Sequence, residues 1–399
     1  MNFWSKLLDN KPIIGLSPMD GVTDVAMRYM SAKYGRPDVM FSEFVSVDAL
    51  AHAKEEKSVD RVMRAFIKAR DVDKYSSNPV TQYSSELQEI RKTGKPENQI
   101  WPYEVAQVFG HTPELFYQAA VIIATLGFDG MDINMGCPAH KVEEQGSGAG
   151  LIRTPEVAQE IVRAAKRGMK DFVDGKVEVR DLGVSDMVKE WVLNHAKGDR
   201  GSELLPVSVK TRIGVSEVVV EQWMETLMEV EPAMISLHGR TLKQLYMGQA
   251  DWEAIGRAAE VVHALGGHIL GNGDVLSITD GKTKVDQYGV DGFLIGRNAE
   301  GNPGIFLDSS IPVTQFSSEL PVNGDTAKLE NSLRKQRLDW MLEHAKVYEQ
   351  VFGSDNFMPM RKHLAWYCKG FPGAGELRSK LVQANSLSDV KTIIGFSRF

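Results

Sequence analysis

Short apolar segments that end in polar or glycine-rich residues recur through the first 300 residues, and this rhythm constrains the fold more than any other feature. Helical patterns lie between most of them; Thr154–Met169, for example, opens with a capping threonine and a proline in its first turn. The eight segments are Pro12–Met19, Asp38–Phe44, Val105–Phe109, Met131–Met135, Val207–Ile213, Met234–His238, His268–Gly271 and Gly292–Ile295. Eight strands alternating with helices predict an α/β fold, a closed (β/α)8 TIM barrel. A doubly wound open sheet is the alternative, because periodicity does not show closure.

Polar stretches interrupt this rhythm at three places. Residues 69–98 and 171–203 show no clear period and are interpreted as insertions into the barrel. Residues 301–325 hold several prolines and serines and are typical of a linker. We therefore predict a barrel domain over residues 1–315.

The remainder of the chain has helical patterns and a basic charge balance. Ala327–Val351 is one long helical pattern, and Asn356–Ala384 holds at least one more helix, so we predict an all-helical domain over 316–399. From Ala327 onward there are 12 Lys and Arg against 7 Asp and Glu, although the whole chain has a net charge of -7. A basic module on an acidic body is suited to a nucleic-acid partner; an ordinary solvated helical surface is the alternative.

Bulk composition narrows the class of protein. The hydrophobic fraction of 43% and the charged fraction of 25% are those of an ordinary globular protein. The best apolar run, Ala119–Ala124, is too short to cross a membrane, and the first residues lack a secretory leader. Cys137 and Cys368 lie in different settings and predict no disulfide framework, so a reducing, cytoplasmic location is expected. We predict no metal site.

Polar residues stand where the predicted strands end. In such barrels the active site lies at that end, in the loops that follow the strands. The residues at these positions are Ser17-Pro18-Met19, Gln107, Asn134, Cys137, Lys210, Arg212, His238, Arg240, Asn272-Gly273-Asp274 and Gly296-Arg297. Taken alone, Cys137 is better explained as a small buried hydrophobe and His238 as a hydrogen-bonded core histidine; the recurrence of polar residues at the strand ends favours a site instead.

Two glycine-rich turns predict a phosphate site. Gly271–Asp274 lets backbone N–H groups approach an anion, and Gly296-Arg297 adds a permanently charged donor. The alternative is two tight turns with a surface arginine. Lys210, on an otherwise apolar strand, needs a partner if it points inward; with His238 it suits the N1/O2 edge of a flavin, where negative charge gathers on reduction.

Several motifs resemble the flavin-dependent tRNA-dihydrouridine synthases over almost the whole chain. The motif NMGCP followed by HGRT is highly specific, whereas GNGD occurs in other flavin barrels. The matching pieces are Leu16–Asp24 (LSPMDGVTD), Asn134–Pro138 (NMGCP), Val209–Gly214 (VKTRIG), His238–Thr241 (HGRT), Gln244–Tyr246 (QLY), Gly271–Asp274 (GNGD), Ile295–Arg297 (IGR) and Arg361–Tyr367 (RKHLAWY), with Lys369-Gly370.

The resemblance implies reduction of the C5=C6 bond of a uridine in tRNA, with FMN as cofactor and NADPH as reductant. Hydride would pass from N5 of FMN to C6, and Cys137, as a neutral thiol, would donate the proton to C5. By the family pattern, Asn134, Arg212 and Arg240 would face the uracil or its backbone. The residues that would hold FMN are Pro18, Met19, Gln107, Lys210, His238, Asn272, Gly273, Asp274, Gly296 and Arg297.

The resemblance also assigns the basic tail to tRNA binding. The residues expected at phosphates are Arg361, Lys362, His363 and Lys369, with Arg378 and Lys380. Trp366 is interpreted as a core residue. The target base would leave its stack to reach the flavin, and a monomer is expected. The acidic body and the two insertions depart from the family pattern.

Two other functions are consistent with parts of this pattern. One is another FMN barrel acting on a free pyrimidine, such as a dihydroorotate dehydrogenase, which has no need of a basic helical tail. The other is a non-catalytic RNA-binding barrel, against which Cys137, Lys210 and His238 argue.

Overall fold

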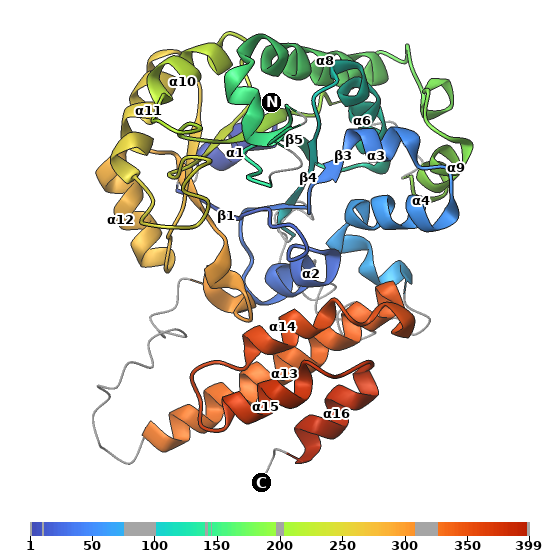
Figure 1. Cartoon of the computed structure of the whole chain (residues 1–399), viewed down its shortest axis with the longest axis vertical. Helices are drawn as coiled ribbons and strands as arrows, with labels where there is room; N and C mark the ends of the chain where they lie inside the picture. The colour runs from blue at the N-terminus through green and yellow to red at the C-terminus, as the bar shows by residue number, and fades with distance from the viewer. Residues whose placement is uncertain are drawn as a thin grey trace. The chain divides into compact units, whose positions relative to one another are not determined.

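The computed structural model describes residues 2–9, 12–75, 101–139, 143–144, 146–196, 203–307 and 326–396. It divides into two compact units (Figure 1). The first, here the barrel unit, comprises Met1–Asp20, Asp38–Ile67 and Tyr103–Gly296. The second, here the helical unit, comprises Gly21–Pro37, Lys68–Pro102 and Arg297–Phe399. The predicted boundary near residue 315 lies outside the described residues. Residues 76–98 of the first predicted insertion also lie outside them.

The barrel unit contains a closed ring of parallel strands. Each of β1, β2 and β4–β9 pairs in parallel with two neighbours, and β2 pairs with both β1 and β4, which closes the ring. The strands are β1 (Ile13–Leu16), β2 (Val39–Phe41), β3 (Val45–Ser46), β4 (Tyr103–Phe109), β5 (Gly130–Met135), β6 (Val207–Arg212), β7 (Ile235–His238), β8 (Ile269–Asn272) and β9 (Gly292–Ile295). The short strand β3 pairs only with the last residues of β4. The predicted closed eight-stranded barrel is confirmed, and the open-sheet alternative is wrong.

Helices separate the strands of the barrel unit. The predicted helix over 154–169 is observed as α8 (Pro155–Val173), and α10 spans Val220–Met228. The others are α1 (Phe3–Leu8), α3 (Val47–His52), α4 (Glu56–Met63), η1 (Arg64–Phe66), α6 (Pro113–Leu126), η4 (Gly148–Arg153), η5 (Val179–Asp181), α9 (Asp186–His195), α11 (Trp252–Ala264) and α12 (Ile278–Tyr288).

The predicted insertion 171–203 is partly helical. Its α9 has Ser185 as the N-cap, and the Ser185 hydroxyl accepts a hydrogen bond from Val188 N at 3.3 Å. Only Val188 and Val192 of this helix are buried. Two apolar positions one turn apart make too narrow a stripe to show as a period, which is why the sequence interpretation missed this helix.

An aromatic cluster fills the barrel where its strands begin. Phe3 and Trp4 of α1 pack among the early residues of the strands, including Ile13, Val39 and Leu270. Trp4 is 1% exposed, and its ring lies 6.4 Å from that of Phe41. The amino-terminal end of the barrel is therefore packed with apolar side chains, which places the polar side chains of the barrel toward the other end of the strands.

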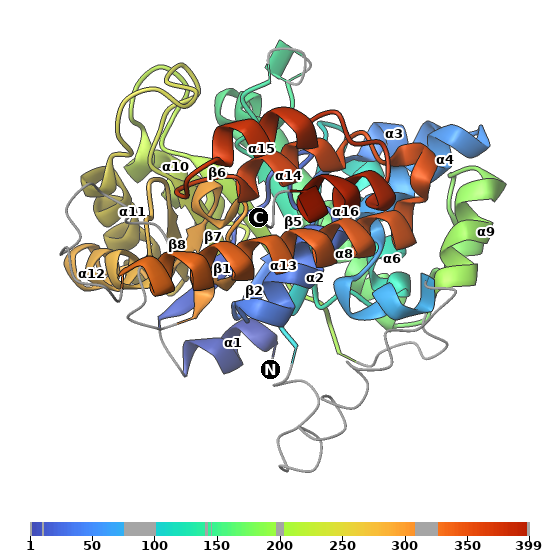
Figure 2. The same ribbon diagram turned by 90° about the horizontal axis from the view of Figure 1, so that it is seen from below.

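The helical unit is built mainly from the C-terminal helices (Figures 1 and 2). It also takes in two segments from the first third of the chain, α2 and η2, which the sequence interpretation had placed in the barrel domain. Its elements are α2 (Val25–Tyr34), η2 (Ala69–Tyr75), η6 (Arg297–Ala299), η7 (Pro303–Phe306), α13 (Thr326–Phe352), η8 (Ser354–Asn356), α14 (Met360–Tyr367), α15 (Ala374–Leu381) and α16 (Leu387–Phe396).

Specific contacts hold α2 to α13. Lys33 Nζ lies 2.7 Å from Glu343 Oε1, Tyr34 donates its hydroxyl to the same carboxylate, and the Tyr34 ring packs 5.3 Å from that of Trp340. Because α2 follows β1 directly in the chain, the helical unit is covalently joined to the barrel unit at both ends of this segment.

None of the described helices is long and apolar enough to traverse a bilayer.

Candidate active site at the carboxyl ends of the strands

A chain of buried hydrogen bonds runs across β6, β5 and β4. Asp132 lies opposite Gln107 on β4 and opposite Ser208 on β6. Its carboxylate accepts hydrogen bonds from Gln107 Nε2 and Ser208 Oγ, both at 2.6 Å. Gln107 Oε1 in turn accepts a hydrogen bond from Asn134 Nδ2 at 3.0 Å. The side-chain amides of Gln107 and Asn134 each use both their oxygen and their nitrogen in hydrogen bonds, so each amide is held in a single orientation.

The network ends at Cys137, just past β5. Asn134 Oδ1 accepts hydrogen bonds from the backbone N–H groups of Gly136 at 2.9 Å and Cys137 at 2.8 Å. These bonds close a tight turn that fixes the backbone of the cysteine relative to the strand. Cys137 is 6% exposed, and burial raises the pKa of its thiol. The thiol is therefore protonated at neutral pH.

Lys210 and Asp132 carry opposing charges in the interior of the barrel. Burial, together with the nearby charge of Arg212, lowers the pKa of Lys210 to about 8, while Asp132 opposes the shift. Burial raises the pKa of Asp132 to about 6 despite its hydrogen bonds from Ser208 and Gln107. Within the described ranges, the Lys210 ammonium makes no hydrogen bond or ion pair. It is a partly buried cation that an anionic group can satisfy.

Arg212 braces the loops after β5 and β7. Its Nε donates to Gly136 O at 2.6 Å, and its Nη1 donates to Thr241 O at 3.2 Å and Leu245 O at 3.3 Å. Burial lowers its pKa to about 10, so the side chain stays charged at neutral pH. The bond to Gly136 places a positive charge beside the turn that carries Cys137.

Arg240 and Asp274 bind each other. Arg240 is 2% exposed, and its Nη2 lies 2.6 Å from Asp274 Oδ2. Further bonds from Arg240 to the carbonyls of Met247 and Gly248 and from Ala250 N to Asp274 secure the loop between them. The sequence interpretation had given the two residues to separate ligands and did not foresee this pair. Arg240 Nη1 also lies 3.5 Å from Nε2 of His238.

The turn after β8 is tightly packed around its second glycine, Gly273. Gly273 has φ 121°, and a Cβ there would lie 2.7 Å from Ala250 Cβ and 3.0 Å from His238 Cδ2. Only glycine fits this position, beside the imidazole. The Asn272 amide is fixed by its bond to Leu294 O at 3.0 Å. The turn is therefore rigid.

Gly296, after β9, lies beside the end of β1. A Cβ on Gly296 would lie 3.6 Å from Met19 Sδ and 3.7 Å from Ser17 Cβ. Pro18 and Met19 are partly buried. Arg297 is the first residue of η6 and belongs to the helical unit.

The predicted tRNA-contacting residues lie on or just after α14, in different settings. Arg361 donates to Ala384 O at 2.8 Å and to Asn385 Oδ1 at 2.6 Å, and Lys369 is exposed. Lys362 is partly buried, with Nζ 2.7 Å from the point where a Cβ on Gly21 would lie. His363 is 1% exposed and pairs with Asp24. A side chain so buried does not reach a phosphate, so we leave His363 out of the proposed contacts.

Asp132 and Ser208 are the site residues that the sequence interpretation missed. Asp132 is visible as a polar residue at alternate spacing from Asn134, on the same face of β5. Its partner Ser208 is set by the register between β5 and β6, which no local pattern reveals.

The fold and the site define an enzyme of the TIM-barrel class, with its polar centre at the carboxyl ends of the strands. More particularly, the chain belongs to the dihydrouridine synthase (Dus) family, whose model matches residues 15–69, 78–189 and 180–395. It is accordingly an oxidoreductase, because forming dihydrouridine is a reduction.

Similar proteins carry the name of the same family. The chain is 28% identical to a probable tRNA-dihydrouridine synthase of Staphylococcus aureus over 98% of its length and 94% of the relative. It is 29% identical to probable tRNA-dihydrouridine synthase 2 of Bacillus subtilis, over 98% and 95%. It also resembles the solved old yellow enzyme of Trypanosoma cruzi, at 9% identity and a TM-score of 0.38 over 73% of this chain and 86% of that one. That last likeness is too low to support any conclusion.

Proposed function

We propose that this chain is an FMN- and NADPH-dependent tRNA-dihydrouridine synthase that reduces the C5=C6 bond of a uridine in tRNA. The observation that carries the proposal is Cys137, a buried thiol whose pKa is raised by burial and whose backbone is fixed by Asn134 at the carboxyl end of the barrel. Family membership and the names of the relatives support the same reaction.

The residues present fit a flavin. The Lys210 ammonium supplies a cation for the N1/O2 edge, and the backbone N–H groups of the glycine-rich turn after β8, beside His238, are the proposed anion site. When bound, reduced FMN supplies hydride to C6 of the uracil. The residues that we propose to hold it are Pro18, Met19, Gln107, Lys210, His238, Asn272, Gly273, Asp274, Gly296 and Arg297.

Cys137 supplies the proton. Its thiol donates a proton to C5 as a general acid. Burial suits this role because it raises the pKa of the thiol and so favours the protonated form. Positive charge on Arg212, which binds the neighbouring carbonyl of Gly136, stabilises the thiolate that remains. The chemistry therefore differs from that of a nucleophilic cysteine, which needs a lowered pKa.

Asn134, Arg212 and Arg240 are the residues that we place at the uracil or its backbone. Asn134 keeps one amide N–H beyond the one that it donates to Gln107. For Arg240 to bind a substrate, its guanidinium has either to leave the Asp274 carboxylate or to bind the carboxylate and the substrate together. The pair then serves to hold both side chains ready in the absence of substrate.

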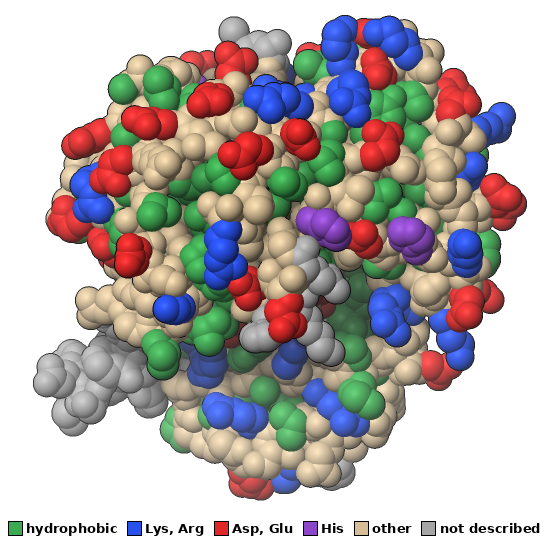
Figure 3. Space-filling model, turned by 45° about the horizontal axis from the view of Figure 1, so that its top comes forward, with side chains coloured by type: hydrophobic (Ala, Val, Ile, Leu, Met, Phe, Trp, Pro, Cys, Tyr) green, Lys and Arg blue, Asp and Glu red, His purple; other side chains and the backbone are tan. Residues whose placement is uncertain are grey.

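We propose that the basic C-terminal segment binds the tRNA. Lys and Arg side chains lie on the visible part of the helical unit in Figure 3, whereas both signs are interspersed over the barrel unit. Arg361, Lys362 and Lys369 are the proposed phosphate contacts. The target uridine is read as an unstacked base. We further propose that the protein acts in the cytoplasm as a monomer.

An anaerobic experiment tests the function. The flavin-loaded protein is reduced with NADPH, and flavin absorbance is followed after addition of tRNA that lacks dihydrouridine. We expect reoxidation on tRNA and formation of dihydrouridine, with no reoxidation by free uridine or orotate. Reoxidation by a free pyrimidine instead would identify another flavin barrel, and a purified protein that binds no flavin would refute the proposal.

A further inference from the structure

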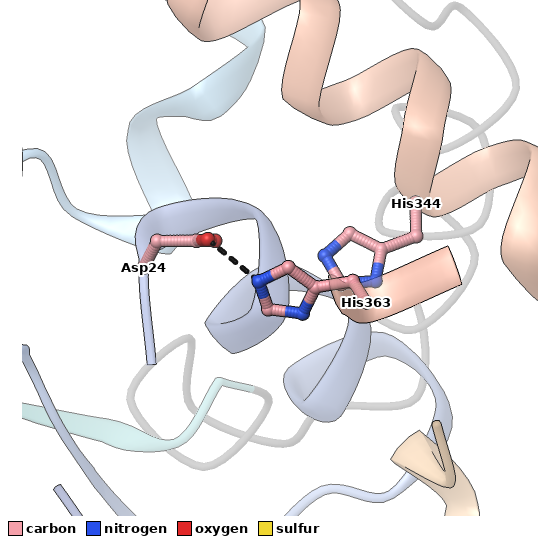
Figure 4. Close-up of side chains that lie close together, drawn as sticks. All are labelled: Asp24, His344 and His363. Atoms are coloured by element: carbon pink, nitrogen blue, oxygen red, sulfur yellow. Dashed lines mark ion pairs between the residues drawn. The ribbon is translucent and has the colours of Figure 1, made fainter. Parts of the chain in front are cut away.

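Three side chains from distant parts of the sequence meet inside the helical unit (Figure 4). They are Asp24 at the start of α2, His344 on α13 and His363 on α14. One potential ligand atom from each lies within 4.8 Å of the other two. Asp24 Oδ2 and His363 Nε2 are 3.1 Å apart, and the two imidazole rings lie 4.7 Å apart. All three residues are buried, with His344 at 0% and His363 at 1% exposure.

The imidazoles leave buried nitrogens without hydrogen bonds. In the part of the chain that the structure describes, three imidazole nitrogens make no hydrogen bond of normal geometry: both nitrogens of His363 and Nε2 of His344. The contact between His363 and Asp24 is close enough for an ion pair but is not aligned as a hydrogen bond. Buried polar atoms nearly always have partners, so a cluster of three without them indicates a missing binding partner.

We propose that Asp24, His344 and His363 form a structural Zn²⁺ site within the helical unit. Two imidazoles and one carboxylate are a ligand set that zinc binds in proteins, and a water molecule would complete its tetrahedral coordination. Ligand atoms on a tetrahedral zinc with bonds of about 2.0–2.1 Å lie about 3.4 Å apart. The carboxylate and His363 are already at about that separation, so only His344 has to approach.

The groups around the three side chains orient them for ligation. Tyr367 Oη lies 3.1 Å from Nδ1 of His344, so an Nδ1–H donated to this oxygen leaves the lone pair of Nε2 for the metal. Asp24 Oδ1 accepts a hydrogen bond from Met27 N at 2.9 Å, which leaves Oδ2 for the metal.

Such a site would join three separate pieces of the helical unit. Asp24 begins the helix that follows the first barrel strand, whereas the two histidines come from the C-terminal helices. A metal here would hold α2 against α13 and α14. The sequence interpretation predicted no metal because none of the three lies near another in the sequence, so no motif of ligand spacing appears.

Metal content and binding test the proposal on the untagged, full-length, flavin-loaded protein. We expect about one equivalent of zinc per chain by mass spectrometry after purification without chelator. After chelation, added Zn²⁺ should raise the Tm, and Co²⁺ should give the visible bands of a tetrahedral site at wavelengths beyond the flavin absorption.

Two variants and one control locate the site. Asp24→Asn keeps an N-cap for α2 but removes the carboxylate, and His344→Gln removes one imidazole. Each should weaken Zn²⁺ binding by more than about 100-fold. His52→Gln, at an exposed histidine of the barrel unit, should bind zinc as the wild type does. If the wild type neither retains nor binds zinc at micromolar concentration, or if His52→Gln loses binding as the others do, the proposal is wrong.

Discussion

Substituting Asp132 by Asn should remove a pH-dependent loss of stability. The Asp132 carboxyl is fully buried, and burial raises its pKa from 3.8 to about 6. Its contribution to stability is therefore fully present below pH 3.8 and is lost as the pH rises through 6. A shift of about two pKa units corresponds to about 3 kcal/mol in total. Roughly half of this, about 1.5 kcal/mol, falls between pH 5 and pH 8, because the unfolded carboxyl is already ionised at pH 5.

The assay is urea unfolding of the wild type and Asp132→Asn at pH 5 and pH 8. Asparagine can accept from Gln107 through its oxygen and donate to Ser208 through its nitrogen, so both neighbours keep partners. We expect the wild type to lose about 1.5 kcal/mol more than the variant between the two pH values. Asp186→Asn, at a side chain that is 92% exposed, is the control and should follow the wild type. Equal pH dependence in Asp132→Asn and the wild type would refute the reasoning.

Three further predictions follow from the structure. Trp4→Ala should cost about 3–5 kcal/mol of unfolding free energy in urea titrations, because it opens a cavity at the packed end of the barrel, whereas exposed Lys6→Ala should change it by less than about 0.5 kcal/mol. Asn134→Ala should lower the single-turnover rate by roughly 100-fold with flavin retained, because the Gly136 and Cys137 N–H groups lose their acceptor; a normal rate would show that this bond does not position the thiol. Affinity for tRNA should fall steeply with salt, and Lys369→Gln should reduce the slope of log affinity against log salt by about 0.7–0.9; an unchanged slope would exclude a phosphate contact by Lys369.

The barrel could be predicted from the sequence because its strands are buried on both faces. Such strands appear as short apolar runs, and those at Val207–Arg212 and Gly292–Ile295 are observed within a residue of their predicted ends. The fold class followed from their number and from the helices between them. The assignment of α2 to the helical unit could not be predicted, because it depends on contacts such as Lys33 with Glu343, far apart in the sequence.

The sequence placed polar residues at the carboxyl ends of the strands, but it did not reveal the hydrogen bonds and ion pairs between them. Cys137, Lys210 and His238 were recognised from their positions at strand ends and from family motifs. The bonds that orient them come from strand register, as for Asp132 with Ser208, or from loops, as for Arg240 with Asp274. The buried position of His363 was missed because the basic residues beside it in the sequence suggested a surface helix.

The central claim is that Cys137 donates the proton to C5 of the uracil. The most direct measurement is the rate at which tRNA reoxidises the reduced flavin in single turnover, for the wild type and for Cys137→Ala. We predict that the variant keeps its flavin and its affinity for tRNA but loses turnover, because the substitution removes the proposed general acid. A variant that reoxidises at close to the wild-type rate would contradict the account.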